Sequence, residues 1–279
     1  MKTKFITLLV FFFVLSASVF GIMQAQGTDE QNNLVDNKYT LVFSDEFDGT
    51  DGSWPDNSKW VCSTRYNSGW NRWISKSNKV AFIKNGKLIC RAIPNTSASS
   101  DTAQMLTGSI ETLGKFSFQY GKVEVRMKTN NLQGNFPAVW MKPVEGNVGH
   151  DYGEIDIVEG CGNLGAAQQT VHSKLNVTLK KKYKKNSFRT SVAMNKWHVY
   201  GMEWTPTSIT FTIDGKVTGT YEKATDKSVL AEGQWTFDRP FYLIVNQSVG
   251  DGNTESMVPK TNRRYETQFD WIRVYRLDN

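Results

Sequence analysis

The sequence consists of short apolar segments separated by turn residues, and helical periodicity is scarce. In residues 121–129, GKVEVRMKT, the apolar side chains of Val123, Val125 and Met127 alternate with charged ones. This two-residue period is typical of a β-strand that buries one face and exposes the other. Residues 241–249, FYLIVNQSV, are more continuously apolar, as expected for a central strand of a two-layer structure. The pattern predicts an all-β fold.

Two dipeptides mark tight turns between such segments. Asn85-Gly86 separates apolar-rich runs in VAFIKNGKLICRAI, and Asp214-Gly215 does the same in ITFTIDGKVTGTY. Both dipeptides tolerate the positive φ angles of a two-residue hairpin turn. Many short strands of this kind predict two antiparallel sheets packed face to face as a β-sandwich. If the sheets curve, one outer face becomes concave, and an elongated ligand could lie there across several strands.

Composition excludes several classes of protein. The 279 residues are 39% hydrophobic and 13% aromatic, which is too apolar for a disordered chain. A mean hydropathy of -0.45 argues against a polytopic membrane protein. Cys62, Cys90 and Cys161 lack the spacing of a zinc site. Buried free thiols are the preferred interpretation, although Cys62 and Cys90 could pair in an exported protein.

Residues 1–25 have the pattern of a secretory signal peptide. Lys2 and Lys4 precede an apolar run that leads to small residues. The alternative is an uncleaved N-terminal anchor. We expect a polar lead over 26–38, one catalytic domain over 39–279, and a protein in the periplasm, at the cell surface or outside the cell, with no stable membrane span. Removal of the two lysines lowers the formal net charge from +6 to +4, which does not indicate a nucleic-acid partner.

The segment DYGEIDIVEGCG places three acids, Glu154, Asp156 and Glu159, within six residues. On a strict two-residue period, Glu154 and Asp156 share one face of a strand and Glu159 points to the other. One extra residue in a β-bulge between Asp156 and Glu159 would return all three acids to the same face, and bulges occur beside active sites. We therefore predict a bulge at this point.

The bulge sets the expected separation of the two glutamates. Glu154 and Glu159 would lie about 13 Å apart at Cα, at roughly 3.3 Å per step. Side chains that lean inward leave the carboxylates about 5 to 6 Å apart, the separation of retaining glycoside hydrolases. Asp156 between them would raise the pKa of a neighbour, so that one carboxyl stays protonated as the acid. The alternatives are three solvated acids on a wet strand face, or a metal site.

The string GEIDIVE resembles the bulged E-x-D-x-x-E signature of glycoside hydrolase family 16, which includes laminarinases, mixed-linkage glucanases and galactan hydrolases. Other segments that resemble the family occur in the same order over about residues 39–277: LVFSDEFDGT, GKFSFQYGKVEVRMK, GNFPAVWM, TVHS, YGMEWTPTSITFTIDG, RPFYLIVNQSVG and FDWIRVYR. The resemblance implies a β-jelly-roll sandwich that hydrolyses a β-linked polysaccharide internally, with retention at the anomeric carbon. It implies that Glu154 is the nucleophile, Asp156 its assisting partner and Glu159 the general acid/base.

The resemblance also implies residues that line a sugar-binding cleft. His172 in TVHS is expected to contact substrate, and Trp140 is either an aromatic floor for a sugar or a core residue. For Trp235 and Gln247, a structural role is the preferred interpretation. The full set of candidates is Trp70, Asn71, Arg72, Trp73, Trp140, His172, Trp235 and Gln247.

Many family members hold a structural calcium ion on the convex face. Glu46, the backbone of Gly86 and Asp270 occupy the matching strings, so a calcium ion there is possible by resemblance. The reaction itself requires no organic cofactor. We expect a monomer whose partner is a β-linked polysaccharide or oligosaccharide.

The substrate is open between two classes. The WNRW string at residues 70–73 resembles enzymes that cleave β-1,3- or mixed-linkage β-1,3/1,4-glucans, which are the leading prediction. In contrast, GHDYG at 149–153 and Gly160 stand where many glucan-specific relatives carry bulky residues. We expect the absence of these bulky residues to open the acceptor side to galactans or host mucin O-glycans such as poly-N-acetyllactosamine. A non-catalytic carbohydrate-binding jelly roll is a third possibility. The lysines of 180–185 are expected to form a solvated hairpin tip, or to attract an anionic glycan.

Overall fold

The alternating segment 121–129 forms strand β6 (Gly121–Thr129) in the computed structural model. Val123, Val125 and Met127 are fully buried, whereas the charged residues between them are half-exposed. Burial of one such side chain contributes about 1.5–3 kcal/mol before conformational entropy is considered. The predicted all-β class is confirmed, and the structure describes residues 39–278 except 98, 131, 147–151 and 163–164. The segments predicted as signal peptide and polar lead lie outside the described residues.

The described residues form fifteen strands in one hydrogen-bonded system, connected in antiparallel pairs. The remaining strands are β1 (Tyr39–Asp45), β2 (Val61–Cys62), β3 (Ala81–Ile83), β4 (Leu88–Pro94), β5 (Met105–Glu111), β7 (Asn135–Pro143), β8 (Gly153–Glu159), β9 (Ala166–Ser173), β10 (Ser187–Ser191), β11 (His198–Trp204), β12 (Ser208–Ile213), β13 (Lys216–Glu222), β14 (Phe241–Val249) and β15 (Tyr265–Leu277). The described helical segments are α1 (Lys174–Val177), α2 (Lys227–Ala231) and the 3-10 turn η2 (Glu255–Met257).

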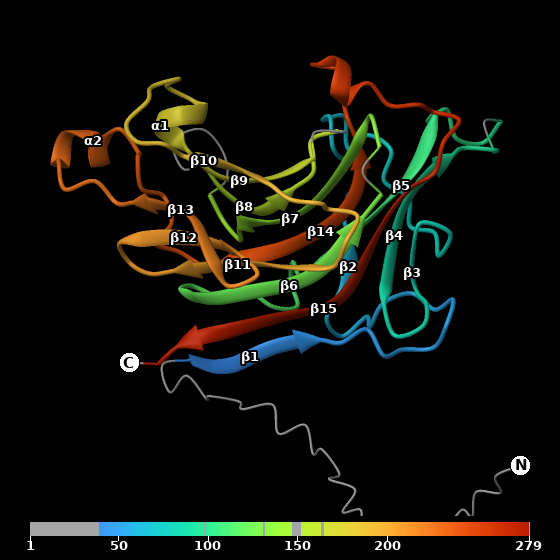
Figure 1. The fold of residues 1–279 in the computed structure, drawn as a ribbon, viewed down its shortest axis with the longest axis horizontal. Coiled ribbons are helices and arrows are strands. Elements are labelled where there is room, and N and C mark those ends of the chain that lie inside the picture. The colour runs from blue at the N-terminus through green and yellow to red at the C-terminus, as the bar shows by residue number, and fades with distance from the viewer. Residues whose placement is uncertain (1–38, 98, 131, 147–151, 163–164, 279) are drawn as a thin grey trace, which may run out of the picture. The chain divides into compact units, whose positions relative to one another are not determined.

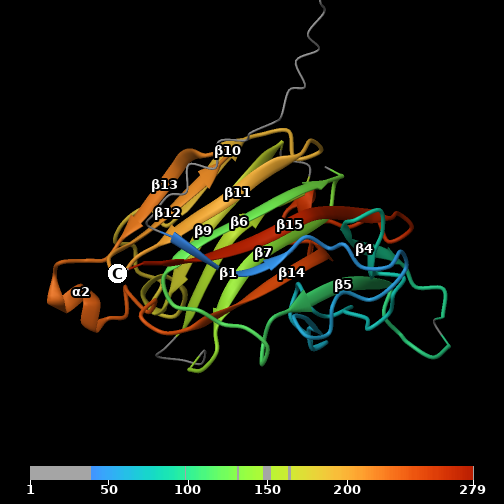
Figure 2. The ribbon, with the colours of Figure 1, turned by 90° about the horizontal axis from the view of Figure 1, so that it is seen from below.

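Two layers of strands form the sandwich. One layer has the order β10-β9-β8-β7-β14-β5, the other has the order β4-β15-β6-β11-β12-β13, and pairing of β4 with β5 joins them. Figure 1 shows β7, β8 and β14 above β6 and β15. Figure 2, seen from below, shows the strands of both layers running in similar directions. Between the layers lies the main hydrophobic core, which includes Val139, Met141 and Ile155 from the first layer and Val125 from the second.

Both predicted hairpin turns are present. Asn85 and Gly86 have φ angles of 51° and 63°, and Asp214 and Gly215 have φ angles of 50° and 74°. These turns connect β3 to β4 and β12 to β13. All three cysteines are free thiols, as the preferred interpretation held, but only Cys90 is buried, and Cys62 and Cys161 are half-buried. Among the described residues, no helix has the length and apolar character that crossing a membrane would require.

Candidate active site

The predicted bulge is present in β8. On one side, Trp140 of β7 pairs with Asp156 and Val139 pairs with Val158, so that Ile157 is the extra residue. On the other side, the register with β9 also shifts between Asp156 and Glu159. Ile157 and Val158 are both fully buried in the core. Because two consecutive residues point inward, the chain resumes its alternation with Glu159 on the same face as Glu154 and Asp156.

The three acids line one cleft of about 380 Å³ on the outer face of the first layer. Aromatic, small and charged side chains from β7, β8, β14 and two loops form its walls. The lining residues are Ser68, Gly69, Trp70, Phe136, Ala138, Trp140, Lys142, Tyr152, Glu154, Asp156, Glu159, Asn246 and Asp251. The alternative of three solvated acids on an open strand face is therefore wrong, because only 2% of Asp156 is exposed and the acids share a concave site.

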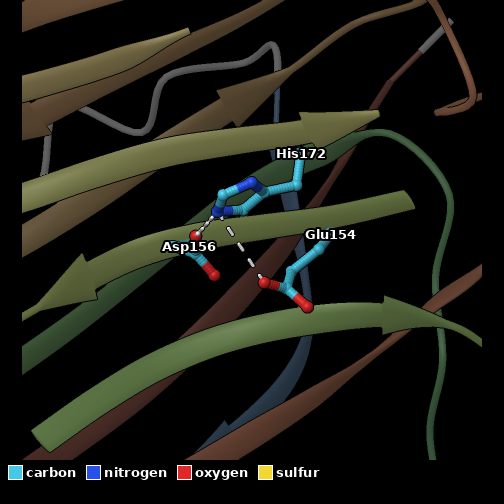
Figure 3. A group of neighbouring side chains, drawn as sticks. All are labelled: Glu154, Asp156 and His172. Atoms are coloured by element: carbon cyan, nitrogen blue, oxygen red, sulfur yellow. Dashed lines mark ion pairs between the residues drawn. The ribbon is translucent and has the colours of Figure 1, made fainter. Parts of the chain in front are cut away.

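His172 lies beside the acids from the neighbouring strand β9, where it pairs with Glu154. Its Nε2 atom is 3.1 Å from Oδ2 of Asp156 and 3.8 Å from Oε1 of Glu154 (Figure 3). Burial lowers the pKa of His172, but the contact with Asp156 and the charges of the acids outweigh this effect and raise the pKa to about 9. The imidazole is thus a cation at neutral pH. Its predicted contact with sugar stays a prediction.

The two glutamates hold protons more strongly than ordinary carboxyl groups. Burial and the adjacent Asp156 charge raise the pKa of Glu154 to about 7, although His172, Lys142 and a hydrogen bond from Tyr152 lower it. Burial, and then the Asp156 charge, raise the pKa of Glu159 well above its usual range. A site with one carboxyl that ionises near neutrality and a second that keeps its proton has the two states that acid/base hydrolysis needs.

One group of described residues could hold a metal ion in the cleft. The ligand atoms of Glu154, Asp156 and His172 all lie within 4.8 Å of one another. With its pKa raised to about 9, His172 carries a proton at neutral pH, and this proton competes with metal binding. The arrangement is better suited to proton chemistry at neutral pH.

Trp140 is half of a paired aromatic wall. Its ring meets Trp70 edge to face at a centroid distance of 4.8 Å, and its Nε1 donates a 2.7 Å hydrogen bond to Oδ1 of Asn246. Only 5% of Trp140 is exposed, whereas Trp70 is half-buried at the cleft. Both residues line the cleft as predicted, and Trp70 is the more accessible of the two.

Asn71, Arg72 and Trp73 do not line the cleft. Asn71 accepts hydrogen bonds from the amide and hydroxyl of Ser68. Arg72 stacks on Trp73 at 4.2 Å and donates to the carbonyl oxygens of Gly69 and Gly250. Trp73 packs against a second, smaller core. Contacts with nearby turns, with the chain after β14 and with the smaller core therefore let these residues hold the Trp70 loop. Their predicted contact with sugar stays a prediction.

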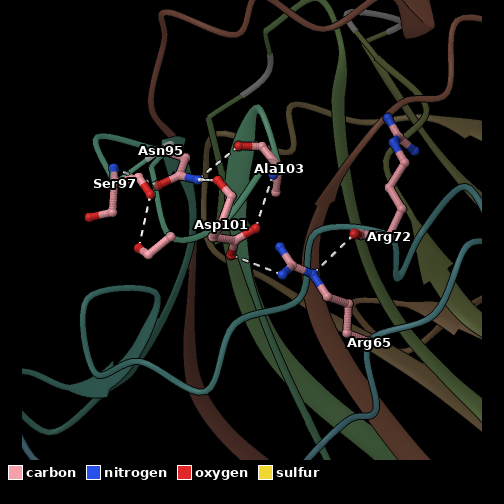
Figure 4. Close-up of polar contacts among 7 residues, drawn as sticks. Arg65, Arg72, Asn95, Ser97, Asp101 and Ala103 are labelled. Carbon is pink, nitrogen blue, oxygen red and sulfur yellow. Dashed lines mark hydrogen bonds and ion pairs between the residues drawn. The ribbon is translucent and has the colours of Figure 1, made fainter.

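The backbone of the same loop is also anchored from outside. The carbonyl oxygen of Arg72 accepts a hydrogen bond from Nε of Arg65, and Arg65 forms a 2.9 Å ion pair with Asp101 (Figure 4). Ser248 of β14 donates a 2.6 Å hydrogen bond to the carbonyl oxygen of Trp70. Together these contacts position the Trp70 indole at the cleft.

Trp235 and Gln247 are structural, as the preferred interpretation held, and neither lines the cleft. Trp235 is 7% exposed and stacks on Tyr221 within the core. Gln247 is fully buried, donates to Asn135 at 2.7 Å and accepts from Thr267 at 2.6 Å. A buried amide with these partners stabilises the sheets and has no surface to offer to a sugar.

The candidate calcium residues do not fit a calcium ion. Both oxygens of Glu46 accept hydrogen bonds from Arg273 at 3.0 Å. Asp270 is paired with Arg126 and with Lys87, the latter at 3.3 Å. Carboxylates that already neutralise arginine and lysine give poor calcium ligands, because the cations repel the ion.

Sequence reasoning did not predict eight of the residues that line the cleft, and three of these carry polar side chains beside the acids or the tryptophans. Tyr152 donates a 2.9 Å hydrogen bond to Oε2 of Glu154. Lys142 and Asn246 lie on the cleft face of β7 and β14. The two-residue period was an available signal, since Tyr152 precedes Glu154 by two positions and Lys142 follows Trp140 by two.

Two further predictions concern Gly160 and the GHDYG segment, where missing bulk was expected to open the acceptor side of the cleft. A Cβ atom at Gly160 would lie 2.9 Å from Cγ of Pro137 and 3.5 Å from Cε of the core residue Met194. The missing side chain is therefore directed away from the cleft, and the prediction that its absence opens the acceptor side is wrong. Residues 149–151 of GHDYG lie outside the described residues.

The lysine run is solvated, and two of its members are paired. Lys184 forms a 2.6 Å ion pair with Glu222 of β13, and Lys181 is paired with Glu232. The run from Lys180 to Lys185 is exposed throughout, and Lys185 leans over the ring of Phe188 at 5.2 Å. Salt bridges and packing to neighbouring segments account for three of the five lysines, so the solvated interpretation fits the structure better than a glycan contact.

Comparison with known proteins gives consistent relatives. The model of the family described as glycosyl hydrolases family 16 matches residues 68–273. A beta-glucanase of Rhodothermus marinus is 32% identical, over 85% of this chain and 85% of its own. A keratan-sulfate endo-1,4-beta-galactosidase of Sphingobacterium multivorum is 31% identical, over 86% of this chain, but this chain spans only 56% of its length.

A solved structure from work on endo-acting O-glycanases, which prominent members of the human gut microbiota express to initiate mucin breakdown, is also similar. It superimposes with a TM-score of 0.74 and 26% identity, over 86% of this chain and 100% of its own.

Proposed function

Because this chain belongs to glycosyl hydrolase family 16 and is a glycoside hydrolase, we propose that it is a secreted, retaining endo-β-glycanase. Glu154 attacks the anomeric carbon while protonated Glu159 donates its proton to the departing sugar oxygen. Glu159 then takes a proton from the water that cleaves the glycosyl-enzyme bond. Asp156 keeps the proton on Glu159 by its negative charge, and it holds His172 as a cation beside the nucleophile.

One observation carries this proposal. The bulge at Ile157 returns Glu159 to the face that carries Glu154 and Asp156, and all three line one cleft. Burial raises the pKa of both glutamates, as a mechanism with an acid and a nucleophile requires. We propose a monomer that needs no organic cofactor.

The leading substrate is a β-1,3- or mixed-linkage β-1,3/1,4-glucan. The beta-glucanase of Rhodothermus marinus matches 85% of both chains, and Trp70 presents an aromatic surface at the cleft. A galactose-containing glycan, including mucin O-glycans, is the second candidate, since a keratan-sulfate endo-β-galactosidase and an O-glycanase structure are comparably similar.

The test is product analysis by mass spectrometry on a panel of laminarin, mixed-linkage glucan, galactan, keratan and mucin glycans. We expect a series of oligosaccharides from one class, and NMR of the first product should show the β-anomer. If no polymer yields oligosaccharides, the hydrolase proposal fails.

A Glu154→Gln variant separates an enzyme from a carbohydrate-binding module. Binding to the identified polymer should stay near normal in the variant while product release is abolished. A module without catalytic activity would bind the polymer and release no product even as the unmutated protein.

A further inference from the structure

Lys142 lies in the same cross-strand row as Glu154. The register of β7 and β8 pairs Trp140 with Asp156 and Met141 with Ile155, so the next position brings Lys142 beside Glu154. On the other side of β8, Glu154 pairs with His172 of β9. Two cations therefore flank Glu154 across the sheet, and the row continues into β14, where Tyr242 pairs with Lys142.

The ammonium group of Lys142 is held at the cleft wall. Its Nζ atom lies 4.9 Å from the ring centroid of Trp140 and 5.8 Å from that of Trp70. Among the described residues, no carboxylate oxygen lies within the ion-pair distance of 4.0 Å from this nitrogen. Cation–π contacts orient the ammonium group without neutralising its charge. The field of Lys142 is thus available to the acids that share the cleft.

We infer that Lys142 is a positioning residue that keeps the Glu154 carboxylate ionised for attack on the sugar, an inference that rests on the proposed function. The titratable groups around Glu154 come from its own segment, from both neighbouring strands, from β14 and from the loop after β14. They are Lys142, Tyr152, Asp156, Glu159, His172, Tyr242 and Asp251. Asp156 disfavours the charge on Glu154, whereas both cations and the Tyr152 hydroxyl favour it.

Lys142 has a different task from His172. The imidazole lies closer to Asp156 than to Glu154, at 3.1 Å against 3.8 Å, so much of its charge compensates the aspartate. The ammonium group lies on the opposite side of Glu154, beside the indoles of Trp140 and Trp70. The Lys142 charge lowers the pKa of Glu154, and an interaction that changes the proton affinity of a carboxyl group tenfold shifts its pKa by about one unit.

The experiment compares Lys142→Met, which keeps an apolar chain on the two indoles, with Lys142→Arg, which keeps the charge. For each protein, kcat/KM is measured against pH on an uncharged polysaccharide that the wild type cleaves. We expect the midpoint of the acidic limb to move to higher pH by roughly one unit in Lys142→Met. At pH values below this midpoint, kcat/KM should be about tenfold lower than in the wild type, and on the plateau it should stay near the wild-type value. Lys142→Arg should keep the wild-type limb.

A second measurement does not depend on turnover. The side-chain carboxyl of Glu154 is titrated by NMR in protein with 13C-labelled glutamate and assigned with Glu154→Gln. Its pKa should be roughly one unit higher in Lys142→Met than in the wild type. An unchanged pKa overturns the inference, as does a loss of activity that is equal at every pH or confined to sulfated substrates. If no polymer is cleaved, the proposed function fails while the titration still decides the role of Lys142.

Discussion

Replacement of Glu154 by glutamine should stabilise the fold while it removes activity. Burial and Asp156 raise the pKa of Glu154 from 4.5 to about 7, so the folded protein keeps a proton that the unfolded chain releases. As pH rises from about 4.5 to 7, the wild type therefore loses stability, because the unfolded state binds fewer protons. The glutamine variant lacks this titration and should not lose that stability.

The magnitude follows from the shift. About 2.5 pKa units correspond to about 3 kcal/mol of destabilisation above pH 7. The glutamine can still accept the hydrogen bond from Tyr152. The pKa of about 7 already includes the attraction to His172. We therefore expect a net gain of about 3 kcal/mol at pH 8, and little difference at pH 4, where the Glu154 carboxyl is mostly protonated in both the folded and the unfolded protein.

Thermal unfolding followed by circular dichroism at pH 4, 6 and 8 measures this gain. For a domain of this size, about 3 kcal/mol corresponds to a rise in Tm of about 6–12 °C. Glu145→Gln, at an exposed glutamate outside the cleft, is the matched control and should change Tm little at any pH. A variant that is no more stable than wild type at pH 8, or equally stabilised at pH 4 and 8, would refute the reasoning.

Three further predictions concern the same residues. The kcat/KM profile of the wild type should be bell-shaped, with an acidic limb near pH 7 set by Glu154 and a basic limb set by Glu159. His172→Ala should be less stable than wild type at pH 6 but not at pH 10, because a folded-state pKa of about 9 gives a contribution that is complete below about 6.5 and lost as pH rises through 9. Deletion of Ile157 should keep part of the activity, because one inward residue in place of two still leaves Glu159 on the cleft face. An alanine inserted after Val158 should abolish activity, because it turns Glu159 to the opposite face.

Each of these predictions has an opposing result. A pH profile with no acidic limb between pH 5 and 8 would contradict the assigned nucleophile. Equal destabilisation of His172→Ala at pH 6 and 10 would show that packing, rather than charge, supports the residue. An inactive but folded Ile157 deletion together with an active insertion would contradict the geometry of the bulge.

Local patterns in the sequence predicted the parts of the site that local geometry determines. The odd spacing of Asp156 and Glu159 predicted the bulge, because a regular strand would bury one of the acids in the core. The Asn-Gly and Asp-Gly dipeptides predicted their hairpins, because few other residues tolerate two positive φ angles in succession.

The parts that sequence did not predict depend on partners far away in the chain. Asp270 cannot serve calcium because Arg126 lies beside it on the neighbouring β6. Arg72 donates a hydrogen bond to the carbonyl oxygen of Gly250, 178 positions away in the sequence. No local pattern identifies such pairs, since they follow only from the order of strands in the sheets.

The charges of the cleft connect stability with chemistry. Asp156 is almost fully buried, and its charge raises the pKa of both glutamates, which costs folding free energy wherever they are ionised. The same charge keeps the proton on Glu159 that the leaving group needs. Lys142 and His172 act on Glu154 from its two sides, because Glu154 must lose its proton at a pH where Glu159 retains one. Removal of Asp156 should therefore lower the pKa of both glutamates, and a double variant of Asp156 and Glu154 should show whether the two groups are coupled.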